Sequence, residues 1–84
     1  KFDFKRSAKD LLITSQLRAA LISNKKIKSV NYNIDTYKKK IYIYGISQNK
    51  TERDEVTKEA KQILDVKDVT TSIFLVDDLR VVKK

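Results

Sequence analysis

The 84-residue chain contains no cysteine, histidine, proline, methionine or tryptophan and only one glycine. The lack of cysteine excludes disulfides, and the lack of both cysteine and histidine excludes the usual structural zinc sites. These absences also exclude Ser-His and Cys-His catalytic pairs and thiol nucleophiles. One glycine is too few for a phosphate-cradling loop or a dinucleotide-binding fingerprint. We therefore expect a non-enzymatic protein that uses no metal and no cofactor.

Positive charge is what the chain has in excess. Charged residues make up 36% of the sequence and the net charge is +8, whereas no run approaches the roughly 18 apolar residues of a membrane span. The N-terminal Lys1-Phe2-Asp3-Phe4 carries no apolar signal region. An excess of cations favours an anionic lipid surface, a nucleic acid or an acidic protein as partner, and does not choose among them.

Two segments show the apolar spacing of helices. The first extends from Ser7 to Asn24, and Ser7 with Asp10 three residues later is typical of a helix start. The second extends from about Thr51 to Leu64, beginning at either Asn49 with Glu52 or Thr51 with Asp54. The residues expected to face the core are Ile13, Leu17, Ala20 and Leu21 in the first helix, and Val56, Ala60, Ile63 and Leu64 in the second.

Three segments alternate between apolar and polar residues, as half-buried strands do. The buried positions are expected to be Val30, Tyr32 and Ile34 in the first, Ile41, Ile43 and Gly45 in the second, and Val69, Thr71, Ile73 and Leu75 in the third. The short polar stretch Thr36–Lys40 predicts an antiparallel hairpin, although it lacks the usual glycine. The third strand extends roughly from Val69 to Val76.

The order helix, strand, strand, helix, strand predicts an α+β fold, a two-layer sandwich with both helices on one face of a three-stranded sheet. The second and third strands are joined through a helix and should run parallel, so the sheet is mixed. We expect one domain over residues 7–77, with terminal tails at 1–6 and 78–84.

This order and these spacings resemble the BON domain, a bacterial module named after an osmotically induced periplasmic protein and nodulation proteins. The resemblance covers most of the chain. It rests on Asp10, Ile13, Thr14, Leu17 and Leu21, on the two strands of the hairpin ending in Gly45, and on Glu52-Arg53 followed by Val56, Ala60, Val66 and Val69. The chain departs from the family pattern at Asp65, where glycine is frequent, and at Thr71, where asparagine is frequent, so the turn after the second helix is expected to differ in shape.

The resemblance implies a non-enzymatic module of the bacterial cell envelope, in the periplasm or at the periphery of the outer membrane. It also implies association with phospholipid or with an envelope protein.

The start of the first helix and the hairpin turn are expected at the same end of the domain. This end collects the candidate contacts for anionic lipid: Lys5, Arg6, Lys9, Lys38, Lys39 and Lys40. A second candidate contact, with membrane or a partner, is the outer face of the first helix with Leu11, Arg18 and Ile22. The alternative for the basic set is an ordinary solvated surface. The alternative for the outer face of the first helix is packing of Phe2 and Phe4 over Leu11, or the scattered apolar residues that are normal on a surface.

The face of the sheet away from the helices carries Tyr42, Tyr44 and Phe74 as a candidate docking surface for another domain or protomer. The alternative is that strand propensity alone favours aromatic residues there.

Two other functions have weaker support. Nucleic-acid binding is suggested by the pI near 9.8 and the tyrosines, but the strand Ile41–Gly45 lacks the RRM core motif and one glycine cannot form a KH loop. The acidic groups Asp77-Asp78 and Glu52, Asp54, Glu55 and Glu59 are better explained by helix-start electrostatics and side-chain pairing than by catalysis.

Overall fold

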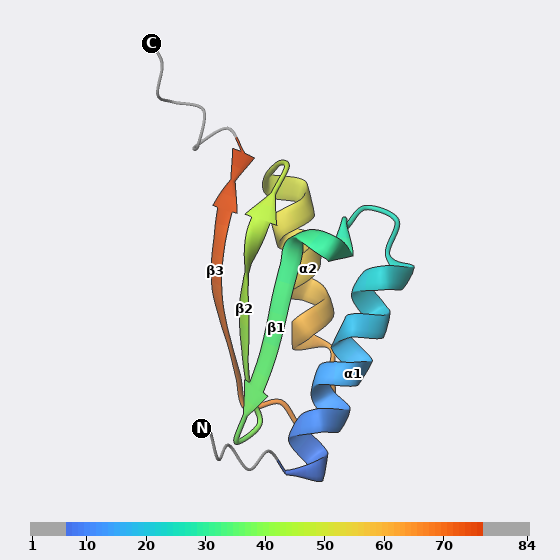
Figure 1. Cartoon of the computed structure of the whole chain (residues 1–84), viewed down its shortest axis with the longest axis vertical. Helices are drawn as coiled ribbons and strands as arrows, with labels where there is room; N and C mark the ends of the chain where they lie inside the picture. The colour runs from blue at the N-terminus through green and yellow to red at the C-terminus, as the bar shows by residue number, and fades with distance from the viewer. Residues whose placement is uncertain (1–6, 77–84) are drawn as a thin grey trace.

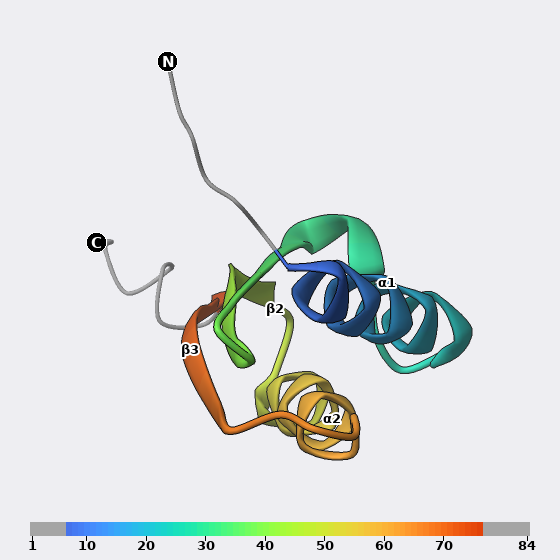
Figure 2. The same ribbon diagram turned by 90° about the horizontal axis from the view of Figure 1, so that it is seen from below.

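The computed structural model describes residues 7–76. Its elements are α1 (Ala8–Ser23), the short 3-10 helix η1 (Ser29–Asn31), β1 (Tyr32–Tyr37), β2 (Lys40–Ser47), α2 (Lys50–Lys61) and β3 (Asp68–Leu75). Both helices lie on one face of the sheet (Figures 1 and 2). The predicted α+β sandwich and its element order are confirmed.

The sheet has the strand order β1-β2-β3, with β1 antiparallel to β2 and β2 parallel to β3. Side chains in one cross-strand row share a face, so the row Tyr32, Gly45 and Ile73 faces the helices. The neighbouring row Asn33, Tyr44 and Ser72 faces away from them. The predicted division of the β2 and β3 side chains between the two faces is therefore confirmed.

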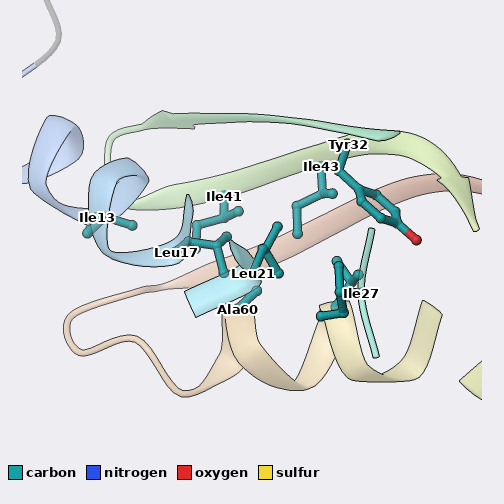
Figure 3. Close-up of a cluster of buried hydrophobic side chains, with 9 residues drawn as sticks. Ile13, Leu17, Leu21, Ile27, Tyr32, Ile41, Ile43 and Ala60 are labelled. Atoms are coloured by element: carbon teal, nitrogen blue, oxygen red, sulfur yellow. The ribbon is translucent and has the colours of Figure 1, made fainter. Parts of the chain in front are cut away.

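The core lies between the sheet and the two helices (Figure 3). Its buried residues come from both helices, the sheet and the loop after α1: Ile13, Leu17 and Leu21 of α1, Ile27 of the loop, Tyr32 of β1, Ile41 and Ile43 of β2, and Val56 and Ala60 of α2. The helical residues recur at intervals of three or four, which places them on one side of each helix. Burial of this apolar set is the main stabilising contribution to the fold.

Both helices begin at a side-chain cap. The hydroxyl of Ser7 accepts a hydrogen bond from the Asp10 N–H at 3.0 Å, and the Asn49 side chain accepts one from the Glu52 N–H at 2.9 Å. These bonds satisfy N–H groups that lack a partner within the helix. Of the two predicted starts for the second helix, the one at Asn49 is therefore confirmed.

Three predicted core positions are wrong. Thr71 is exposed, although it lies on the helix side of β3, because β3 is an edge strand at the margin of the layer that the helices cover (Figure 2). Val30 is 89% exposed because it lies in η1, before the strand alternation begins at Tyr32. Leu64 is 81% exposed because α2 ends at Lys61, three residues earlier than predicted. Asp65 then adopts a left-handed conformation, with φ 69°, and turns the chain toward β3.

Candidate functional site

Three segments distant in sequence meet at the lower end of the domain in Figure 1: the start of α1, the β1–β2 turn and the connection from α2 to β3. The Asp10 carboxylate of α1 accepts hydrogen bonds from the turn, and the Lys67 N–H donates to the Lys39 carbonyl oxygen at 2.8 Å. The Lys9 ammonium contacts the Asp65 carboxylate at 2.8 Å. These contacts fix the three segments relative to one another.

The β1–β2 turn is tighter than predicted. The strands extend to Tyr37 and from Lys40, so only Lys38 and Lys39 connect them, and both have positive φ, 54° and 66°. Two-residue turns of this kind favour Asn-Gly, since other side chains are strained at positive φ. The five-residue loop predicted over Thr36–Lys40 is wrong because Thr36 is buried in β1.

Asp10 holds this strained turn in place. Its two carboxylate oxygens accept the N–H groups of Lys38 at 2.9 Å and Lys39 at 2.8 Å, and its side chain is buried. Desolvation raises the pKa of Asp10, but these two N–H groups together with Ser7 outweigh it and lower the pKa below its ordinary value. The negative charge of Asp10 is therefore directed at the backbone and not at the lysine side chains.

The lysines surround an open hollow of about 370 Å³ that is lined by Ser7, Asp10, Tyr37, Lys38, Lys39 and Lys67. We call Lys9, Lys38, Lys39, Lys40 and Lys67 together the basic end. The Lys38 ammonium lies 5.4 Å from the centre of the Tyr37 ring, within the range of a cation–π contact. Several cations at one exposed end form a surface that attracts anions.

Besides Asp10, two further carboxylates reduce the charge of the basic end. The hydrogen bond from Lys9 and the charge of Lys9, with a smaller contribution from Lys39, lower the pKa of Asp65. Asp68 faces Lys40 in the cross-strand register. Lys38, Lys39 and Lys67 are consequently the cations of the basic end best placed for an external anion.

The structure brings Lys9, Lys38, Lys39 and Lys40 together as predicted, whereas Lys5 and Arg6 lie outside the described residues. Lys67 is not among the residues predicted from the sequence. It reaches the basic end because α2 ends at Lys61 and the chain then runs beside the β1–β2 turn before β3 begins. A correct prediction of the α2–β3 connection would have placed Lys67 there.

Lysines are also present at the opposite end, at positions 25, 26 and 28. Acidic side chains of α2 offset them: Lys26 lies 3.8 Å from Glu55, and the Asn24 amide donates to Glu55 at 3.0 Å and Glu59 at 2.8 Å. The Asn24 bond and then Lys26 and Lys58 lower the pKa of Glu55. This end therefore offers less unbalanced positive charge than the basic end.

The outer face of α1 is exposed at Leu11, Arg18 and Ile22. Leu11 lies close to the basic end, while Ile22 lies about 16 Å farther along the helix at 1.5 Å per residue. Between Leu11 and Ser23 the only charged residue is Arg18. This face is far less charged than α2, yet its three predicted contacts do not converge on one spot.

Tyr44 and Phe74 are exposed and Tyr42 is half-buried on the open face of the sheet. The same face also carries two acidic residues, Asp35 and Asp68, and one basic residue, Lys40. The strand register places them there, because Asp35 is opposite Tyr42 and Asp68 is opposite Lys40. This face therefore has no excess positive charge, so an anionic surface would not be attracted to it.

Of the predicted acidic groups, the carboxylates of α2 serve the fold, as the pairing of Glu55 and the capping contacts of Glu52 indicate. Asp77-Asp78 lies outside the described residues. Within residues 7–76 no cluster of carboxylates suited to a metal ion occurs, and neither helix is long and apolar enough to cross a membrane.

Replacing Asp10 with asparagine is expected to change how stability depends on pH. Because the folded pKa of Asp10 is lowered, its stabilising contribution is present above about pH 4, the ordinary range of aspartate, and is lost as pH falls through the folded pKa. In urea unfolding from pH 7 to pH 2.5, Asp10→Asn should be less stable than wild type at neutral pH, and the difference should shrink in acid. Asp54→Asn, at an exposed carboxylate of α2, is the control. A difference independent of pH would contradict this role of Asp10.

The family model of the BON domain matches residues 9–77. A curated relative, described as an uncharacterized protein in the gshII 5' region of Anaplasma centrale, is 35% identical over 71 residues. The match covers 84% of this chain and 47% of the relative, so the chain spans about half the length of that protein.

Proposed function

The chain belongs to the BON domain family, and on this basis we propose that it is a non-enzymatic binding module of the bacterial cell envelope whose basic end contacts anionic phospholipid headgroups. The family is one of membrane-associated and envelope-associated modules. Contact with lipid by this chain, and a location in the periplasm or at the periphery of the outer membrane, are our proposals.

The observation that carries the proposal is the pair of lysines at the tip of the β1–β2 turn. Both occupy a left-handed conformation that asparagine and glycine adopt at lower cost. A strained residue supports a functional hypothesis when a residue with less strain would serve the fold equally well. Two cations held at an exposed turn beside Lys67 suit a surface of phosphate groups.

Leu11 extends the proposed contact. It is exposed one turn beyond the start of α1, the end of the helix that lies at the basic end, although it faces a different side of the helix from Lys9. An apolar side chain flanked by cations enters the boundary between headgroups and acyl chains when the cations lie on the headgroups. Ile22 lies too far along α1 to share this contact.

The test is sedimentation with vesicles of phosphatidylglycerol and phosphatidylcholine, compared with vesicles of phosphatidylcholine alone, at near-physiological salt. Lys38→Asn with Lys39→Gly removes both charges and gives the turn the sequence that it favours. Each basic residue near the surface contributes about 1 kcal/mol, so this variant should bind anionic vesicles roughly thirtyfold more weakly.

The matched control is Lys25→Gln with Lys28→Gln, which removes two charges from the opposite end. It should bind nearly as well as wild type. Equal losses in the two variants would mean that net charge alone drives binding. No binding of the wild-type chain to anionic vesicles, or full competition by a short DNA duplex, would contradict the proposal.

A further inference from the structure

The strand β3 lies at one edge of the sheet and pairs with β2 along one side. Natural edge strands are usually protected from further pairing by a charged residue, a proline or a bulge. Between Val69 and Leu75 the sequence is Val-Thr-Thr-Ser-Ile-Phe-Leu, which contains neither charge nor proline. Its register with β2 is continuous from Asp68 to Leu75, so it contains no bulge. From Val69 to Leu75 this edge therefore carries none of these three protections.

The middle of β3 is also exposed on both faces of the sheet. Thr70 and Ser72 lie on the open face and Thr71 lies on the helix side, yet all three are exposed. Figure 2 shows β3 at the margin of the layer that the helices cover. The other edge strand, β1, differs because it carries Asp35. Another strand can therefore approach β3 without displacing any side chain of the described domain.

We propose that β3 pairs antiparallel with β3 of a second copy, which joins the two sheets into one of six strands with all helices on the same face. Directly opposed residues in an antiparallel pair share a face. The two-fold axis must therefore pass between a residue and the same residue of the second copy. An axis at Thr71 or at Ser72 gives the longest overlap of the two β3 strands. With Thr71 on the axis, Val69 faces Ile73, a favourable β-branched pair.

Of the ways to bring two copies together, the antiparallel orientation keeps their cations farthest apart. Two copies of a chain with net charge +8 repel each other unless their cations are kept apart. Antiparallel pairing places the basic end of each copy at opposite ends of the joint sheet. Asp68 is the only charged residue of β3, so the contact itself is free of like-charge pairs. The paired segments span about 23 Å, at 3.3 Å for each of the seven residues that overlap when the axis lies at Thr71 or Ser72.

The lack of cysteine in the chain provides a direct test. A cysteine on the two-fold axis lies opposite itself, with Cα atoms about 4.5 to 5.5 Å apart, within the range that a disulfide spans. Under mild oxidation either Thr71→Cys or Ser72→Cys should form a covalent dimer. Val30→Cys, at a residue that is 89% exposed in η1, is the control and should remain monomeric.

A second measurement needs no cysteine. The sedimentation coefficient of the wild-type chain should rise with concentration. Thr71→Lys places two like charges face to face if the axis lies at Thr71, and diagonally across the two strands if it lies at Ser72. It should therefore remove this rise, while Val30→Lys should keep it. The proposal is overturned by a wild-type chain that stays monomeric up to about millimolar concentration, or by equal cross-linking of all three cysteine variants, because random collision explains that result.

Discussion

Replacing Gly45 with alanine is expected to destabilise the domain by about 3 kcal/mol, at the upper end of the usual cost of adding a methyl group to a packed site. A Cβ atom at Gly45 would lie 2.5 Å from the Asn31 carbonyl oxygen and 2.5 Å from Cδ1 of the Tyr32 ring. The carbonyl belongs to the backbone, and the ring is only 5% exposed in the core. Neither neighbour can move away without disturbing β1.

Urea unfolding followed by circular dichroism would measure the loss. Ser72→Ala is the control because it also leaves alanine in a strand of the sheet, but at an exposed position and without adding a carbon atom; surface changes of this kind usually stay within about 0.5 kcal/mol. A Gly45→Ala variant within about 1 kcal/mol of wild type would contradict the proposed clash. The result also bears on the family pattern, since Gly45 is the glycine on which the resemblance rests.

The helix starts, the core face of α1 and the alternation of β2 could be predicted because they depend on local sequence. Ser7 and Asn49 each cap a helix through a residue three positions later, and this spacing is visible in the sequence. The parallel pairing of β2 and β3 followed from the helix that joins them. Local patterns were thus sufficient for the fold.

The failures occur where distant residues decide the conformation. The two-residue turn at Lys38-Lys39 depends on Asp10, 28 residues earlier in the chain, whose carboxylate satisfies the turn N–H groups. The prediction that Leu64 is in the core failed for another reason. It assumed that the helical periodicity continues to Leu64, whereas α2 ends at Lys61.

Asp65 shapes the turn between α2 and β3. Glycine is frequent there in the family pattern, and the left-handed φ of 69° explains why glycine suits the position. Aspartate tolerates this conformation better than most side chains. Its carboxylate also gains the contact with Lys9 at 2.8 Å. The substitution keeps a turn that glycine would favour and adds an ionic contact to the basic end.

The buried carboxylate of Glu52 joins three segments at the end of the domain opposite the basic end. It is 4% exposed, and its oxygens accept hydrogen bonds from the N–H groups of Gln48 at 2.7 Å and Lys28 at 2.9 Å. Its own N–H donates to the Asn49 cap. Glu52 therefore ties the start of α2 to the end of β2 and to the loop after α1, as Asp10 ties α1 to the turn.

Glu52→Ala is expected to lower the free energy of unfolding by about 3 kcal/mol, because it leaves two backbone donors without an acceptor and removes buried side-chain volume. Glu52→Gln keeps one acceptor oxygen and turns an NH₂ group toward the other donor, so about half of the loss should remain. Urea unfolding at pH 7 would rank the two variants.

Tyr32→Phe is the control for Glu52→Ala. Desolvation, with a smaller contribution from the neighbouring Glu52, raises the pKa of Tyr32 to about 12. The Tyr32 hydroxyl lies near Ser47 and Glu52 but forms a hydrogen bond of good geometry with neither. Removing it takes away no acceptor and should cost less than about 1 kcal/mol, since a buried polar atom without a partner contributes little. If Tyr32→Phe cost as much as Glu52→Ala, disturbed packing around Tyr32 would explain both losses, and the two N–H bonds to Glu52 would not be what holds this end together.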